Sequence, residues 1–249
     1  MFGIAAGEYG ETLRRFATLF PRPAAIVVVS AHWEAPGPVR VNAVKKPDLI
    51  YDFGGFPPAL YELTYPASGS PWIAEEALTL LADAGIPAAR EDSRGWDHGV
   101  WIPLRLLYPE AEVPVVEISL PLPRDPDTVL RIGAALAPLR RQNVLLLGSG
   151  GIVHNLRLAR LDRETGPVDD WARAFDAWVR ERVEARDFAA LARYSELAPD
   201  AELAVPETEH FDPLLFAAGA AREDDRIDEI ATGFQYANLS LSSYAFVPR

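Results

Sequence analysis

Three runs of consecutive apolar residues constrain the fold of this chain more than any other feature of its sequence. They are "AAIVVVSA" (residues 24–31), "VPVVEISL" (residues 113–120) and "NVLLLGSGG" (residues 143–151), and their apolar parts show no alternation with polar residues. Such runs are typical of strands that are buried on both faces of a sheet. Helical segments lie between them. We therefore expect an α/β fold: a single domain with a central, mostly parallel or mixed sheet that is covered by helices on both faces.

Three dipeptides mark where helices begin. Ser70-Pro71, Asp125-Pro126 and Asp212-Pro213 each combine a capping side chain with a proline that suits the first helical turn. The helices expected from these signals run to Gly85, to about Arg141 and over 213–221. The other expected elements are helices over 8–19, 168–186 and 187–198, a loop leading into a helix over 95–109, and strands over 39–44, 87–92 and within 226–247.

The composition excludes several classes of site and partner. The chain has no cysteine, so histidine, aspartate or glutamate must hold any metal. Its net charge of -12 argues against nucleic acid, which usually needs a basic face. No run approaches the roughly 18 apolar residues of a membrane span, and the start has no signal-peptide pattern. We expect a cytoplasmic protein without a membrane partner, folded as one domain over residues 1–249.

The chain has only four histidines, and all of them lie at strand ends or in loops. His32 follows the first apolar run, and His154 lies a few residues beyond another strand end. His98 precedes one expected helix, and His210 lies two residues before the N-cap of the last. Ligands of open α/β sheets bind outside the carboxyl ends of the strands. A lone histidine there is usually only a hydrogen-bonded side chain, but imidazole is also the commonest metal ligand. We expect the four histidines to converge on one rim of the sheet, where imidazoles from distant parts of the chain meet around one divalent cation.

Acidic side chains accompany the histidines along the chain. Glu34, Asp97, Glu207 and Glu209 each lie within three residues of a histidine. They are candidates for direct ligands or for acceptors that orient a ring nitrogen. For Glu207 we favour an ordinary solvated charge.

Aromatic residues flank the same motifs, and many lie in a long loop rich in proline and glycine. A loop of this length in a compact domain is usually functional or disordered, and its aromatic content argues against disorder. Aromatic side chains beside histidines suit a flat, apolar substrate, although core packing explains some of them. The flanking aromatic residues are Trp33, Tyr51, Phe53, Trp96 and Trp101.

The glycine cluster "LGSGG" has rival interpretations that its spacing does not support. It lacks the G-x-x-x-x-G-K-[ST] pattern of a phosphate loop and misses the dinucleotide fingerprint. Ser149 is not within G-x-S-x-G, the pattern of a hydrolase nucleophile. We expect these glycines to let the backbone approach a site closely.

Several long motifs together resemble the class III extradiol ring-cleavage dioxygenases of the DOPA-dioxygenase type. The resemblance runs from about residue 20 to the C-terminus. The motifs are "SAHWE", "YDFGGFPPALYEL", "WDHGVWIPLRLLYPEAEVPVVEISL", "GSGGIVHNLR" and "TEHFDPLLFAAGA". The resemblance implies Fe(II)-dependent opening of a catechol-type ring by O₂, next to the two hydroxyls, with zinc found in the same site of some members.

The resemblance also implies roles for individual residues. His32 and His210 match metal ligands, and His154 matches a histidine that is either a further ligand or the acid/base beside the metal. His98 matches a histidine of the substrate pocket with a catalytic role. We expect Trp33, Tyr51 and Phe53 to contact the substrate beside it.

The sequence departs from the family pattern at its start. The family begins with a strand that ends in Ser-His-Gly, whose histidine is a metal ligand, whereas "MFGIAAGEYGETLRRF" matches the segment after it. We therefore expect the strand carrying the N-terminal metal ligand to be missing from this sequence. Two alternatives to the dioxygenase stay open: a non-enzymatic binding or scaffold member of the same fold, and a zinc-dependent hydrolase. Assembly into a homo-oligomer also stays open.

Overall fold

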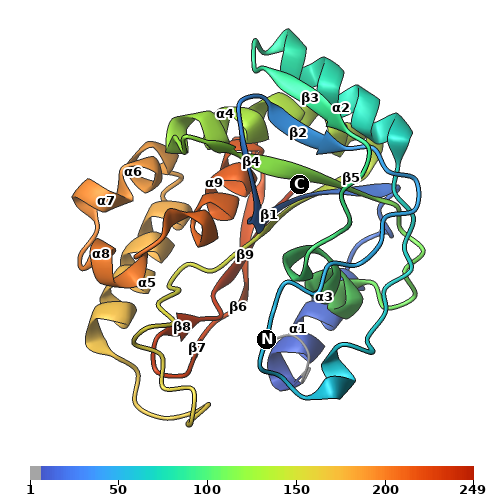
Figure 1. Ribbon diagram of the computed structural model, residues 1–249. Helices are drawn as coiled ribbons and strands as arrows, with labels where there is room; N and C mark the ends of the chain where they lie inside the picture. The colour runs from blue at the N-terminus through green and yellow to red at the C-terminus, as the bar shows by residue number, and fades with distance from the viewer. Residues whose placement is uncertain (1–6) are drawn as a thin grey trace.

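The apolar runs form neighbouring strands of one five-stranded sheet (Figure 1). The computed structural model describes residues 7–249, so the expectation about the start of the chain lies partly outside the described residues. The central strand β1 (Ala25–Pro36) pairs in parallel with β4 (Val115–Leu122) and with β5 (Val144–Ser149). The strand β2 (Val39–Asn42) runs antiparallel to β4 and parallel to β3 (Ala88–Glu91), which gives the order β3-β2-β4-β1-β5. The expected mixed sheet is confirmed.

Alternate residues of β1 enter two separate cores, one on each face of the sheet. Val27 and Val29 pack into the larger core, whereas Ile26 and Val28 pack into the smaller one with Trp96 and residues of the helix over 98–107. Burying each such side chain stabilises the fold by roughly 1.5–3 kcal/mol. Burial on both faces explains why this strand has no polar alternation.

Helices cover both faces of the sheet, as Figure 1 shows. The side chains of α2, α4, α5 and α9 line the larger core, and α3 lines the smaller one. The described helices are α1 (Gly7–Ala17), α2 (Pro71–Asp83), α3 (His98–Leu107), α4 (Pro126–Leu136), α5 (Asp170–Glu184), α6 (Phe188–Ala192), α7 (Tyr194–Leu197), α8 (Ala201–Ala204) and α9 (Asp212–Gly219), with 3-10 turns η1 (Pro58–Leu60), η2 (Ala137–Gln142) and η3 (Thr208–His210).

Two of the three capping predictions are correct. The Ser70 side chain accepts a hydrogen bond from the Ile73 amide, and the Asp125 side chain accepts one from the Thr128 amide, 3.2 Å away. The prediction for Asp212 is wrong in detail, because Asp212 is the first residue of α9 and its side chain is buried rather than capping. The prediction of one helix over 187–198 is wrong as well. The segment forms two short helices, because the backbone at Arg193 ends α6 before α7 begins.

The closing strands form small sheets outside the central one. The strand β6 (Arg226–Ala231) pairs antiparallel with β9 (Ser243–Val247), and β7 (Phe234–Gln235) pairs with β8 (Leu239–Ser240). Within residues 7–249, the structure contains no helix that is long and apolar enough to cross a membrane.

Candidate metal and catalytic site

An irregular, bulged segment of β1 accounts for the histidine in an otherwise buried strand. Val29 pairs with Ile118 and Glu34 pairs with Leu120, so β1 advances by more residues than β4 between these two pairs. Residues 30–33 lie opposite a single residue of β4, so they leave the regular ladder between these two strands. A bulge of this kind re-aims side chains at the rim of a sheet. Here the bulge includes His32, which lies within β1, four residues before the strand ends.

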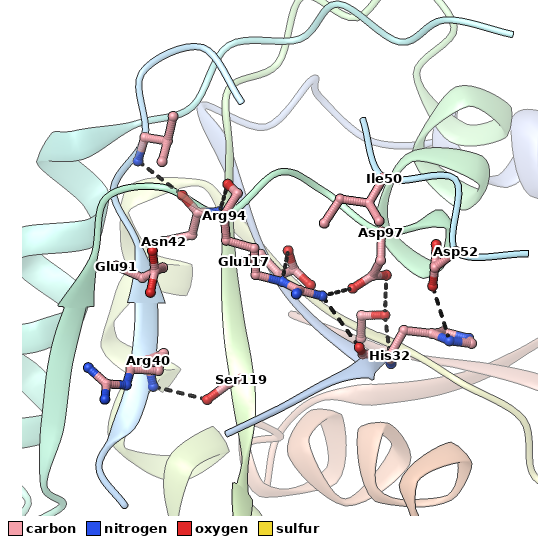
Figure 2. A network of polar contacts seen from close by, with 12 residues as sticks. His32, Arg40, Asn42, Ile50, Asp52, Glu91, Arg94, Asp97, Glu117 and Ser119 are labelled. Carbon is pink, nitrogen blue, oxygen red and sulfur yellow. Dashed lines mark hydrogen bonds and ion pairs between the residues drawn. The ribbon is translucent and has the colours of Figure 1, made fainter. Parts of the chain in front are cut away.

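A buried polar network holds the bulge in place (Figure 2). The Ser30 hydroxyl donates to Asp97 Oδ1 over 2.6 Å and accepts from the His32 amide over 3.2 Å. The Arg94 guanidinium donates to the His32 carbonyl over 3.3 Å and to Asp97 Oδ2 over 2.9 Å. Gly99 gives this network room, because a Cβ at that position would lie 2.3 Å from the Ser30 hydroxyl oxygen. The backbone around His32 is therefore fixed from both sides.

Beneath the network lies a carboxyl group that is fully buried. Glu117 Oε2 is 3.7 Å from Arg94 Nε, and among residues 7–249 no hydrogen-bond partner is found for either Glu117 oxygen. Burial raises the pKa of Glu117 well above its ordinary value, and the nearby Asp97 carboxylate raises it further. A neutral Glu117 leaves Asp97 as the counterion of Arg94. The guanidinium also covers the ring of Trp33, at 4.8 Å, and Trp33 is only 6% exposed. Its contact with a substrate stays a prediction.

The four histidines meet in one cluster, although they come from distant parts of the chain. The ring centroids of His32 and His98 are 4.1 Å apart, and those of His32 and His210 are 5.1 Å apart. The His154 ring stacks on His210 at 3.7 Å. The sequence-based expectation that all four imidazoles gather at one edge of the sheet agrees with this arrangement, while their roles as ligands or catalysts stay predictions.

Glycines bring the loop after β5 into this cluster. The Gly151 amide donates to the His210 carbonyl over 2.8 Å, and a Cβ on Gly150 would lie 2.2 Å from the same oxygen. Two backbone segments can approach this closely only where no side chain separates them. The close approach that was expected of "LGSGG" is present, and it places His154 beside His210.

The sequence analysis missed Asp52, which lies between two of the histidines. Asp52 Oδ2 is 3.3 Å from Nδ1 of His32, and Oδ1 is 3.0 Å from Nδ1 of His98. Oδ1 also accepts the His98 amide over 2.8 Å. Ligand atoms of His32, Asp52 and His98 lie within 4.8 Å of one another, so this group could hold a metal ion. Asp52 is far in sequence from every histidine, and its position between Tyr51 and Phe53 is the signal that the sequence offers for it.

Burial keeps two imidazoles of this cluster, those of His32 and His154, neutral. It lowers the pKa of His32 to about 4, with further lowering from His98 and His210. It lowers the pKa of His154 to about 3, again with the neighbouring rings adding to the effect. Neutral imidazoles keep a free lone pair, and together with a carboxylate they suit zinc or ferrous iron. The chemistry of the donor set therefore fits a divalent transition metal.

The acids that flank the histidines in sequence have different partners. Glu209 Oε1 lies 3.1 Å from Nδ1 of His210, and Glu34 and Glu209 both pair with Arg124. Burial alone would raise the pKa of Glu209, but hydrogen bonds from His210 and Arg124 bring it down to about 2. Glu207 pairs with Arg157 at 3.2 Å, and both side chains are more than half exposed. That surface pair agrees with the interpretation of Glu207 as a solvated charge.

Aromatic side chains line one side of the histidine cluster. The ring of Phe53 meets His98 edge to face at 5.7 Å, and Tyr51 packs against Trp101 at 5.5 Å. The Tyr51 hydroxyl donates to the Leu63 carbonyl over 2.5 Å, and this hydrogen bond joins two parts of the same loop. Trp96 and Trp101 are fully buried and belong to the core. Phe53 is therefore the aromatic residue that is placed directly against a candidate catalytic histidine.

The fold and the site together define an α/β protein with a histidine- and carboxylate-lined site at the rim of a mixed sheet, of the kind that holds a divalent metal. Comparison with known proteins then gives the family. Residues 4–247 match the model for the catalytic LigB subunit of aromatic ring-opening dioxygenase. The chain belongs to this family of extradiol, aromatic ring-opening dioxygenases, and the resemblance read from the sequence motifs is confirmed.

Individual relatives agree with this assignment over most of the chain. The 4,5-DOPA dioxygenase extradiol of Beta vulgaris is 40% identical over 90% of this chain and 83% of the relative. The protein of the same description from Escherichia coli K12 is 35% identical over 94% of this chain and 86% of the relative. A crystal structure of an uncharacterized protein from Escherichia coli K12 superposes with a TM-score of 0.79 at 31% identity, covering 95% of this chain and 91% of that chain.

Proposed function

We propose that this protein opens a catechol-type ring with O₂ at the histidine cluster, with Fe(II) as its cofactor. The observation that carries the proposal is the meeting of four imidazoles at one rim of the sheet, in a chain of the ring-opening dioxygenase family. Relatives that are described as 4,5-DOPA dioxygenases point to a catechol as the substrate class. In the reaction, the ring opens at the carbon–carbon bond beside the pair of hydroxyl-bearing carbons, and both atoms of O₂ enter the product.

In this proposal His32, His154 and His210 would hold the metal. Their lone pairs are available at neutral pH, because burial lowers the pKa of His32 to about 4 and that of His154 to about 3. A bound Fe(II) would supply electron transfer between a catechol and O₂. Zinc fits the same donors but has no redox chemistry, so a zinc-loaded site would bind substrate without opening it.

The residues around these ligands orient the substrate and move its protons. His98 takes a proton from a catechol hydroxyl, with Asp52 as the carboxylate that stabilises the charge which the ring gains. His154 is the second candidate for this acid/base role. The Phe53 ring, and beyond it Tyr51, form an apolar wall on which a planar substrate packs and from which water is excluded. Trp33, whose ring packs against the Arg94 guanidinium, is a further candidate for contact with the substrate.

The test is anaerobic loading with Fe(II), addition of a panel of catechols that includes DOPA, and then exposure to air. We expect a yellow ring-opened product, consumption of O₂, and a product mass equal to that of the substrate plus O₂. Tight Fe(II) binding without turnover across the panel would favour a binding or scaffold role. Activity on a hydrolysable substrate that persists without O₂ would favour a zinc hydrolase.

A further inference from the structure

A single guanidinium joins the two chain segments that carry His32 and His210. Arg124, which follows β4, places Nε 2.7 Å from Glu34 Oε1 and Nη1 2.8 Å from Glu209 Oε2. It also donates to the Thr208 hydroxyl. Glu34 lies two residues after His32 on β1, and Glu209 directly precedes His210 in η3. The arginine therefore links the bulged strand to the turn that presents the stacked histidine.

The two oxygens of Glu209 face different partners, and this fixes the direction of each hydrogen bond. Arginine can only donate, so Glu209 Oε2 accepts from Arg124. The other oxygen, Oε1, lies 3.1 Å from Nδ1 of His210. An ionised carboxylate can only accept, so the proton of a neutral His210 ring must lie on Nδ1. The opposite ring nitrogen, Nε2, then carries the free lone pair.

We propose that Arg124 is a positioning residue which acts through Glu209 to hold His210 in the tautomer whose Nε2 is free to bind a metal ion. Carboxylates that orient a metal-binding imidazole in this way usually change metal affinity by 10–100-fold when they are replaced. These contacts engage both Glu209 oxygens, one with Arg124 and one with His210. The part of the inference that concerns metal binding rests on the proposed function, whereas the tautomer does not.

The variant Glu209→Gln gives a sharp test, because the amide has one accepting and one donating end. Since Arg124 only donates, it should hold the amide oxygen, and the NH₂ group should face His210. The hydrogen bond to the ring is then reversed, and the proton moves to Nε2. Removing the arginine as well, in Arg124→Ala/Glu209→Gln, lets the amide rotate and makes the Nδ1–H form available again.

The measurement is ¹⁵N–¹H correlation NMR of the metal-free protein with labelled histidine at mildly alkaline pH, with His210 assigned from His210→Gln. We expect the Nδ1–H tautomer in the parent protein, Nε2–H in Glu209→Gln, and return of Nδ1–H signal in the double variant. An Nε2–H tautomer in the parent protein, or the same tautomer in the single and double variants, would overturn the inference. A merely structural role of Arg124 would not produce this reversal.

Zinc affinity, measured by chelator competition, gives a second readout that does not depend on turnover. We expect Glu209→Gln to weaken zinc binding by about 10–100-fold and the double variant to recover part of this loss. Glu207→Gln is the matched control, because Glu207 lies two residues away and pairs only on the surface with Arg157, and it should bind zinc like the parent. If the tautomers behave as expected but no catechol is opened, the proposed function fails and the positioning role stands.

Discussion

The imidazole of His154 stacks on that of His210, with ring centroids 3.7 Å apart and planes only 9° from parallel. The two residues come from the loop after β5 and from η3, and backbone contacts through Gly151 bring them together. Two stacked, partly buried imidazolium ions would repel each other strongly. The stacked arrangement therefore favours uncharged rings. This preference makes the stability of the fold depend on pH.

The first prediction is that the metal-free protein loses stability as the pH falls below about 6.5. Burial lowers the pKa of His154 to about 3 and that of His32 to about 4. Between these values and the ordinary histidine pKa, the unfolded chain binds more protons than the folded one, so acid favours unfolding. Each histidine contributes a slope on the order of 1 kcal/mol per pH unit. Urea unfolding at several pH values measures this slope.

The matched variant for this experiment is His154→Gln, which keeps a polar side chain but cannot take up a proton. It should show a shallower loss of stability between neutral pH and about pH 4 than the parent protein. Equal slopes for the two proteins would show that His154 is not held neutral by the fold.

The second prediction separates two possible metal ligand sets. We expect His32→Ala and His210→Ala to lose bound metal, and His98→Ala to keep it while turnover or substrate affinity falls. The structure also offers the group His32, Asp52 and His98, whose ligand atoms lie within 4.8 Å of one another. Metal analysis after dialysis decides between them. Full metal content in His32→Ala would mean that the site is misplaced, and loss of metal in His98→Ala but not in His210→Ala would assign the metal to the group with Asp52.

The third prediction concerns Asp52 as the partner of His98. Its Oδ1 lies 3.0 Å from His98 Nδ1 and also accepts the His98 amide. Asp52→Asn keeps the shape but removes the charge that stabilises a protonated His98, so we expect kcat to fall by about 10²–10⁴-fold, the usual contribution of acid–base catalysis. Steady-state kinetics with saturating Fe(II) measures kcat and KM separately. A change confined to KM would show that Asp52 orients substrate and does not assist proton transfer.

Sequence reasoning could predict those features whose cause lies within a few residues. The strands β1, β4 and β5 were found because burial on both faces leaves an unbroken apolar run. The four histidines can be predicted because they are few and lie beyond strand ends or in loops just before helices. In contrast, Asp52 contacts His98 across 46 residues of chain, so no local pattern could connect them.

Features that depend on pairing between distant strands also could not be predicted from the sequence. The bulge around His32 exists because β1 and β4 lose their common register between Val29 and Glu34, and only the paired strands show this. The salt bridges of Arg124 likewise join three segments that no sequence pattern connects. The capping role expected of Asp212 failed for a similar reason, because tertiary packing buries that side chain instead.

The fourth prediction tests whether the bulge positions His32. A Cβ at Gly99 would lie 2.3 Å from the Ser30 hydroxyl oxygen and 3.1 Å from Cδ2 of His32, so Gly99→Ala must displace one of them. Overpacking of this kind costs roughly 1–3 kcal/mol of unfolding free energy, and we expect metal affinity to fall with it because the imidazole moves. Gly54→Ala is the control, since a Cβ there meets no atom within 4 Å. Urea unfolding and zinc titration of both variants measure the two effects, and a Gly99→Ala protein that is destabilised but binds zinc like the parent would show that the bulge supports the fold without setting the position of His32.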